Sequence, residues 1–350
     1  MDEQLRKIIE AGIMAPSGDN CQPWRFEVNG DLIRLYNIPD RDVSQFNYRQ
    51  RASLIAHGAL IENMSIAASV HGMKAEVALF PHKAEADYVA DIRIVPGNVG
   101  ADPLARSIAA RCTNRRRYRG GVLEENQCES LISAATPFTG ARVRLFSGKE
   151  RERAARVIGL NDRLVFENRD LHAFLFDHIR WSDVEAETTR DGMDIRTLEL
   201  TPLDALAFKL FKGFNLVSFL NHFGVSRIIG ANGRKLAMSA ADIGVITMPG
   251  VEPADYITCG RAMERVWLEA TRQGLAFQLM TGISFLMGRV EAGDPGTLSP
   301  EHVEMVGNGR RELKMSLGSD AGEPLIIFRV GAADGPSARS LRLPVGLWQG

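Results

Sequence analysis

The chain has 350 residues, with 42 Lys and Arg against 43 Asp and Glu and a formal net charge of −1. This balance gives no global field that would attract nucleic acid or an anionic membrane, and no uncharged apolar stretch is long enough to span a bilayer. The four scattered cysteines, with no Cys-x-x-Cys, argue against a zinc site or a disulfide framework; together with the polar N-terminus they predict a cytoplasmic protein.

The first informative stretch is a turn of small residues after a short amphipathic helix. The helix breaks at Pro16, and the chain becomes extended again at Trp24; between them the sequence reads Pro-Ser-Gly-Asp-Asn-Cys-Gln-Pro-Trp. Such a turn presents backbone N–H groups and short side-chain amides, which can bind the edge of a flat heteroaromatic ring. A single Pro-Ser-Gly would indicate an ordinary helix-to-strand loop, but the full string is more specific.

Helices and strands alternate along the rest of the chain. Asn29-Gly30 predicts a two-residue hairpin turn between strands at 24–28 and 32–36. Further strands are expected at 74–79, 88–95, 142–146, 242–248, 275–279 and 324–330. Helices are expected at 51–71, 124–134, 254–273 and 300–315, and residues 150–235 are expected to be largely helical.

Two helix-to-strand segments repeat one another. Residues 58–72 align with residues 260–274, and Gly, Glu, Ala and Gly coincide at the same four offsets. Each copy ends in a glycine suited to the position after a helix and then leads into a strand. Four identities in fifteen residues could arise by chance among helices rich in Ala and Gly. We interpret the repeat as two similar α/β halves in one chain.

A basic segment follows the first half. It begins Arg111-Cys112-Thr113-Asn114-Arg115, so that two guanidinium groups and a hydroxyl alternate. These groups can converge on one dianionic phosphate. A basic run can also be a solvated surface or a weak nucleic-acid patch, and the sequence leaves those alternatives open.

The turn resembles the flavin-contacting turn of the nitroreductase family, Pro-Ser-x-x-Asn-x-Gln-Pro-Trp. The segment from Arg111 to Arg115 resembles that family's Arg-x-Ser/Thr-x-Arg/Lys signature, which holds the flavin phosphate. The nearest subgroup is the Acg-type group of single chains with two nitroreductase-like halves. The resemblance implies an α+β fold in which two α/β halves, with central mixed sheets flanked by helices, form an internal pseudo-dimer. Residues 1–100 would be the first half and 101–350 the second, with a helical insertion at about 150–235.

The resemblance also implies one composite FMN site per chain, because the turn occurs only in the first half and the phosphate signature only in the second. Residues 274–282 match the place where family members run a strand past the flavin ring, and a backbone N–H among residues 278–282 is expected to lie near N5. The expected cofactor contacts are Pro16, Ser17, Gly18, Asn20, Gln22, Arg111, Cys112, Thr113, Arg115, Gln278, Met280, Thr281, Gly282 and Arg339.

The function implied is that of an FMN-dependent oxidoreductase. It would pass hydride from NAD(P)H to a nitroaromatic, quinone or similar acceptor, with no catalytic side chain and no metal. The alternatives are a protein that stores or sequesters FMN with little turnover, and an interaction module that has lost its flavin. The aromatic residues between 166 and 214 could form a lid over the flavin or a helix-packing core. The sequence leaves open a monomeric pseudo-dimer or a homodimer.

Overall fold

The computed structural model describes residues 3–82 and 84–345. Up to residue 96 its main elements are α1 (Glu3–Gly12), β1 (Trp24–Asn29), β2 (Leu32–Asn37), α2 (Arg51–Val70), β3 (Met73–Leu79) and β4 (Tyr88–Pro96). The chain then forms α3 (Ala105–Ala110), α4 (Glu125–Ser133), β5 (Arg142–Phe146), α5 (Gly148–Glu167), α6 (Arg169–Asp177), β6 (Ile179–Arg180), α7 (Asp183–Thr189), β7 (Met193–Asp194), α8 (Pro202–Leu210), α9 (Phe214–Asn221) and α10 (Val225–Met238). The last elements are β8 (Asp242–Met248), α11 (Pro253–Arg272), β9 (Ala276–Leu279), α12 (Gly282–Glu291), α13 (Pro300–Leu317) and β10 (Glu323–Gly331).

Two four-stranded sheets share one topology. Their strand orders are β1-β2-β4-β3 and β5-β8-β10-β9, so in each sheet the fourth strand along the chain lies between the second and the third. In each, a 20-residue helix, α2 or α11, connects the second strand to the third. The same order and the same position of the helix give a two-half arrangement, and the expected α+β class is confirmed.

The two sheets are antiparallel, whereas the family resemblance led us to expect mixed sheets; that expectation was wrong. Each helical connection does join strands of the same direction, but the last strand inserts between them and makes every neighbouring pair within these described sheets antiparallel. A parallel contact occurs at the edge of the second sheet, where Thr113 forms an isolated bridge with Phe277.

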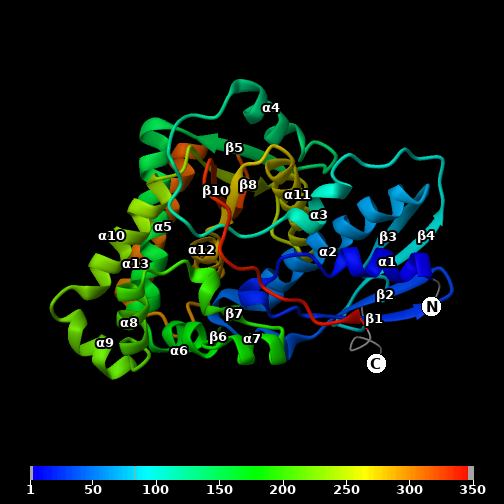
Figure 1. The fold of residues 1–350 in the computed structure, drawn as a ribbon. Helices are drawn as coiled ribbons and strands as arrows, with labels where there is room; N and C mark the ends of the chain where they lie inside the picture. The colour runs from blue at the N-terminus through cyan, green and yellow to red at the C-terminus, as the bar shows by residue number, and fades with distance from the viewer. Residues whose placement is uncertain (1–2, 83, 346–350) are drawn as a thin grey trace.

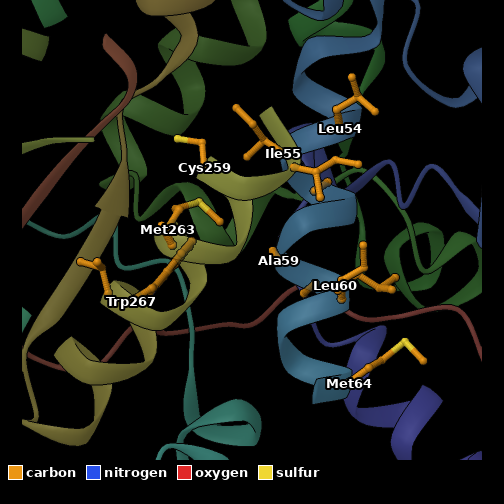
Figure 2. Close-up of a cluster of buried hydrophobic side chains, with 14 of the residues drawn as sticks. Leu54, Ile55, Ala59, Leu60, Met64, Cys259, Met263 and Trp267 are labelled. Carbon is orange, nitrogen blue, oxygen red and sulfur yellow. The ribbon is translucent and has the colours of Figure 1, made fainter. Parts of the chain in front are cut away.

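Helices α2 and α11 cross at the two aligned glycines. A Cβ atom at Gly58 would overlap the carbonyl oxygen of Ile257 and lie 2.9 Å from the Cα of Gly260. A Cβ atom at Gly260 would in turn overlap the carbonyl oxygen of Ile55. Since no other residue type lacks the Cβ, these two positions allow the helix backbones to touch. Figure 2 shows the crossing, with apolar side chains between and around the two helices: Leu54, Ile55, Ala59, Leu60, Met64, Cys259, Met263 and Trp267.

The segment between β5 and β8 is mostly helical, and Figure 1 shows its helices α5, α8, α9 and α10 at the end of the molecule opposite the first sheet. Here the second half has α5 to α10 where the first half has only the hairpin turn at Gly30, whose φ is +62°. The short parallel pair of β6 and β7 was not expected, because strands of two residues leave no alternation to read.

A hydrophobic core joins the two halves. One cluster contains buried residues of α1, both sheets, α2 and α11, and a second lies between the helices of 148–317 and the other face of the second sheet. The division at residue 100 stays a prediction, since the first cluster runs across it. None of the described helices combines the length and the apolar character that crossing a bilayer requires.

Candidate functional site

The turn after α1 is held in an unusual backbone conformation. Asp19, Asn20 and Gln22 have φ of +42°, +59° and +51°, a region that costs energy for residues with a side chain. The Gln22 N–H donates to the Ser17 hydroxyl at 2.9 Å and closes the turn. The conformation is therefore fixed by the turn's own contacts before any ligand is considered.

A large chamber of about 850 Å³ lies beside this turn. Its walls come from both halves: the turn, α2, α11, the end of β9, and the helices of 148–238. This volume is within the range of small-molecule and cofactor sites. Of the residues that the sequence singled out, those that line it are Pro16, Ser17, Gly18, Thr113, Arg115, Gln278, Met280, Thr281 and Gly282.

A smaller polar pocket of about 90 Å³ adjoins the chamber. The two cavities adjoin, because both are lined by Pro16, Ser17, Asp19, Thr113 and Arg115. The further sequence-predicted residues around the small pocket are Asn20, Arg111, Cys112 and Arg339.

Arg111 is buried at the back of the small pocket. Its guanidinium donates to the Met14 carbonyl at 2.6 Å, lies 3.2 Å from the Glu264 carboxylate, and stacks 4.4 Å from the centre of the Trp267 ring. Burial raises the pKa of Glu264 to about 7, and the Arg111 charge opposes that rise. Part of the Arg111 charge is thus neutralised from behind, whenever Glu264 is ionised.

Arg115 stands at the junction of the two cavities. Its guanidinium contacts the Thr197 carbonyl at 3.3 Å and the Met193 sulfur at 3.6 Å, which are neutral groups. Its low-dielectric surroundings lower its pKa, and nearby Asp19 counteracts this. The pKa of Asp19 is itself raised by burial. A cation whose hydrogen-bond partners are neutral, at the junction of two cavities, is suited to an anionic ligand.

Two further arginines complete the small pocket. Arg339 donates to the carbonyls of Ala109, at 2.8 Å, and Ala110. Arg342, which the sequence analysis left out of the predicted site, bonds to the Asn20 amide oxygen at 2.8 Å and lines the pocket. Burial and the Arg111 charge lower the pKa of Arg342 to about 9. The pocket is consequently rich in positive charge.

Asn20 and Gln22 hold the C-terminal segment against the turn. The Asn20 amide donates to the Leu341 carbonyl at 3.0 Å, and the Leu343 N–H donates to the Gln22 amide oxygen at 2.9 Å. Gln22 also donates to the Arg190 carbonyl at 2.8 Å and is fully buried. It lines neither cavity, so the structure gives its amide a structural contact in place of the predicted contact with a ring edge.

The strand expected at 275–279 is present as β9, Ala276–Leu279. β9 ends at Leu279, and Gly282 is the first residue of α12. The Met280 N–H donates to the Ile327 carbonyl at 2.7 Å and is not available to a flavin N5. The Gln278 amide oxygen accepts from Arg329 at 2.8 Å.

The helices of 148–238 form an aromatic wall of the chamber. Phe166, Phe174, Phe208 and Phe211 line the chamber, and Phe176 stacks on Phe208 with ring centres 4.8 Å apart. These aromatic residues thus line the chamber and also pack against one another, and a lid over a flavin stays a prediction.

Asp162 on α5 is one of the acidic groups of this wall; Glu199 and Asp204 also line the chamber. The Asp162 carboxylate packs against Gly233, where a Cβ would overlap it, and burial raises its pKa to about 6. Sequence reasoning missed Asp162, because a single Asp in an amphipathic helix is normally exposed.

Arg329 was also missed, although it is fully buried on β10. It donates to the Arg116 carbonyl at 2.7 Å and stacks 3.9 Å from the centre of the Tyr118 ring. It thus fixes the segment that carries Arg115. An arginine inside an otherwise apolar strand was the available signal.

Comparisons with known proteins support the resemblance to the Acg-type group that the turn and the Arg-x-Thr-x-Arg segment indicated. No family model matches the chain. It is 26% identical over 342 residues to MT1398, an uncharacterised protein of Mycobacterium tuberculosis (strain CDC 1551 / Oshkosh), a match over 96% of this chain and 46% of that protein. It is 24% identical over 291 residues to Acg of the same organism, provisionally named an NAD(P)H nitroreductase, a match over 81% of each chain. The chain is a distant relative of the Acg-type proteins.

The match to Acg runs over most of both chains, whereas this chain spans less than half the length of MT1398. Among solved structures, the FMN-dependent nitroreductase NfnB from Mycobacterium smegmatis, in complex with NADPH, aligns with a TM-score of 0.40. The identity is 15%, over 69% of this chain and 94% of that chain.

Proposed function

We propose that the two adjoining cavities bind FMN, and that the protein is an FMN-dependent NAD(P)H oxidoreductase. The observation that supports this most strongly is the pairing of an 850 Å³ chamber with a small pocket bordered by four arginines. A flat ring in the chamber and a phosphate in the pocket match the chemistry of the two linings. The name of the relative Acg agrees with such a role.

In this proposal the phosphate is held by residues of the second half. Arg115 and Thr113 border both cavities and would bind the phosphate oxygens, while Arg111, Arg339 and Arg342 add positive charge behind them. Asp19 also borders both cavities. Its raised pKa favours the neutral acid, which reduces repulsion of a phosphate.

The ring would lie between the turn of the first half and the end of β9. Pro16, Ser17 and Gly18 border the chamber on one side, and Met280 to Gly282 border it on another. FMN bound there would supply hydride transfer between NAD(P)H and a nitroaromatic, quinone or similar acceptor. The aromatic wall of 148–238 provides apolar surface for a second flat molecule.

The proposal is tested by the visible absorption spectrum of the purified protein after incubation with FMN and gel filtration, followed by anaerobic NADPH and NADH. We expect a yellow protein that loses its colour with at least one of the two donors. Arg115→Gln should weaken FMN binding about 10- to 100-fold, because charged hydrogen bonds to the phosphate are lost. Arg117→Gln is the matched control, since Arg117 belongs to the same basic segment but is exposed and borders neither cavity.

Storage of FMN is the second candidate, and the same experiment separates it. A yellow protein that stays oxidised with both donors would favour storage over reduction. The open side of the chamber argues for reduction: two of its lining residues, Asp204 and Asn232, are themselves exposed to solvent. A protein that cannot take up FMN would contradict both candidates.

A further inference from the structure

The helices α8, α9 and α10 expose an unusual number of large apolar side chains. Leu203 is 77% exposed, Phe223 in the turn between α9 and α10 is 72% exposed, and the other exposed apolar residues of this segment range down to 44% at Leu216. We call this set the α8–α10 surface; it consists of Leu203, Leu206, Leu210, Leu216, Phe219, Phe223 and Ile228. Clustered exposed apolar residues mark interaction sites, whereas isolated ones are ordinary.

The same segment carries little negative charge, and its acidic residue is the exposed Asp204 in the first turn of α8. Between residues 205 and 241 the sequence contains no Asp or Glu, although the whole chain carries 43 of them. Its basic residues are exposed: Lys209, Lys212, Arg227, Arg234 and Lys235. The nearly neutral net charge of the chain therefore hides a local surface that is both apolar and positive.

We propose that the α8–α10 surface binds the surface of an anionic membrane. Short helices with Leu and Phe facing outward and with Lys and Arg beside them are suited to lie in the headgroup region, where each basic side chain gains from anionic lipid. The chain attaches at this surface and does not span the bilayer, in agreement with the character of its described helices.

The charges favour a membrane over a second copy of the chain. A symmetric dimer through the α8–α10 surface would place identical basic clusters against each other without carboxylates from residues 205–241 to neutralise them. An anionic bilayer satisfies both properties of the surface at once.

The α8–α10 surface lies beside an opening of the chamber. The inner side of α8 lines the chamber with Ala207 and Phe208, and the exposed lining residues Asp204 and Asn232 place an opening of the chamber between α8 and α10. Figure 1 shows these helices at the periphery, at the end of the molecule farthest from the first sheet. A bilayer on this surface would lie next to the opening. This binding does not depend on the proposed FMN site.

The test is co-sedimentation of the full chain with vesicles of phosphatidylcholine, with and without about a third of phosphatidylglycerol as the anionic lipid, at low and high salt. We expect binding to the anionic vesicles that weakens as salt increases. Lys209→Gln with Lys212→Gln should reduce the affinity about 20- to 30-fold, at roughly fivefold per lysine. Phe219→Ser with Phe223→Ser should reduce it at least about tenfold through lost apolar burial.

Matched controls are Lys149→Gln and Val122→Ser, which change an exposed lysine and an 87% exposed valine elsewhere and should bind as the wild type does. Circular dichroism checks that every variant is folded. The proposal is overturned if the anionic vesicles do not bind the wild type, or if vesicles of phosphatidylcholine alone bind it equally well. It is also overturned if light scattering shows a dimer that Phe219→Ser with Phe223→Ser dissociates while vesicle binding is absent.

Discussion

Individual side chains in the chamber hold ionisation states that differ from those of the unfolded chain, and Asp162 is the clearest case. The pKa of its carboxyl is about 6 in the folded protein, against about 4 for an unfolded Asp. As the pH rises from 4 to 6 the unfolded chain releases this proton while the folded chain keeps it. The free energy of unfolding therefore falls over that window, and the loss is complete above pH 6.

Asp162→Asn should remove this loss. We expect the variant to match the wild type at pH 4 and to be more stable by about 1 to 2 kcal/mol at pH 7.5. This gain is smaller than the full pKa shift implies, because the wild-type carboxylate retains some contact with the cavity. Urea unfolding at the two pH values measures it. Asp320→Asn, at an exposed turn, is the control. A difference between variant and wild type that does not change with pH would contradict the assignment.

His57 on α2 gives the free energy of unfolding a pH dependence of the opposite sign. It is fully buried, its ring lies 3.0 Å from the Asn37 amide oxygen, and burial lowers its pKa to about 3. The unfolded chain gains a proton near pH 6.5 that the folded chain does not, so stability falls as the pH drops from 6.5 toward 3. In the Asp162→Asn background, where the opposing effect is removed, acid unfolding should show this slope. His57→Gln should flatten it, and an unchanged slope would rule out His57 as its source.

At the scale of elements, the crossing of α2 and α11 is the contact that leaves least space for a larger side chain. Gly58→Ala would force the two backbones apart, and we expect a loss of about 2 to 3 kcal/mol or more in the free energy of unfolding. Gly307→Ala in α13 is the matched control, because its Cβ would meet only the end of the Arg311 side chain, at 3.7 Å. That control should gain about 0.5 to 1 kcal/mol from the better helix former. Equal effects of the two variants in urea unfolding would contradict a close crossing.

The regular elements could largely be predicted from the sequence, because hydrophobic period and turn residues act locally. The hairpin at Asn29-Gly30, both 20-residue helices and the strand at 242–248 are confirmed. Helices α3 and α12 were missed. α3 has only six residues, and α12 begins at Gly282 directly after an apolar strand, with no capping bond from the Thr281 side chain to mark its start.

The site could be predicted only where the residue types of a sequence motif indicate a specific chemistry. The turn and the Arg-x-Thr-x-Arg segment border the same pair of cavities, although about a hundred residues separate them. The partners of Gln22, Met280 and Arg342 could not be predicted, because each bonds to a segment whose position depends on the tertiary fold. The antiparallel sheets were missed for the same reason, since strand neighbours are set by long-range pairing.

At the scale of the whole molecule, we expect the two halves to act as one folding unit. The buried crossing helices and the shared core cluster join the halves, although a second cluster lies within the second half. We expect a chain cut by a protease at a site introduced between Gly100 and Ala101, in an exposed connection, to remain one particle. Size-exclusion chromatography of the cut protein measures this. A separate, folded fragment of residues 1–100 would show that the halves are independent domains.

The central claim is that one composite site binds a flavin ring with the first half's turn and a phosphate with the second half's arginines. Equilibrium titration of the protein with FMN and with riboflavin, followed by the quenching of flavin fluorescence, tests it most directly. The two ligands share the ring and differ in the phosphate. We predict that FMN binds at least about 100-fold more tightly, as expected for two or more charged hydrogen bonds to the phosphate. Equal affinity for the two ligands, or no binding of either, would contradict the claim.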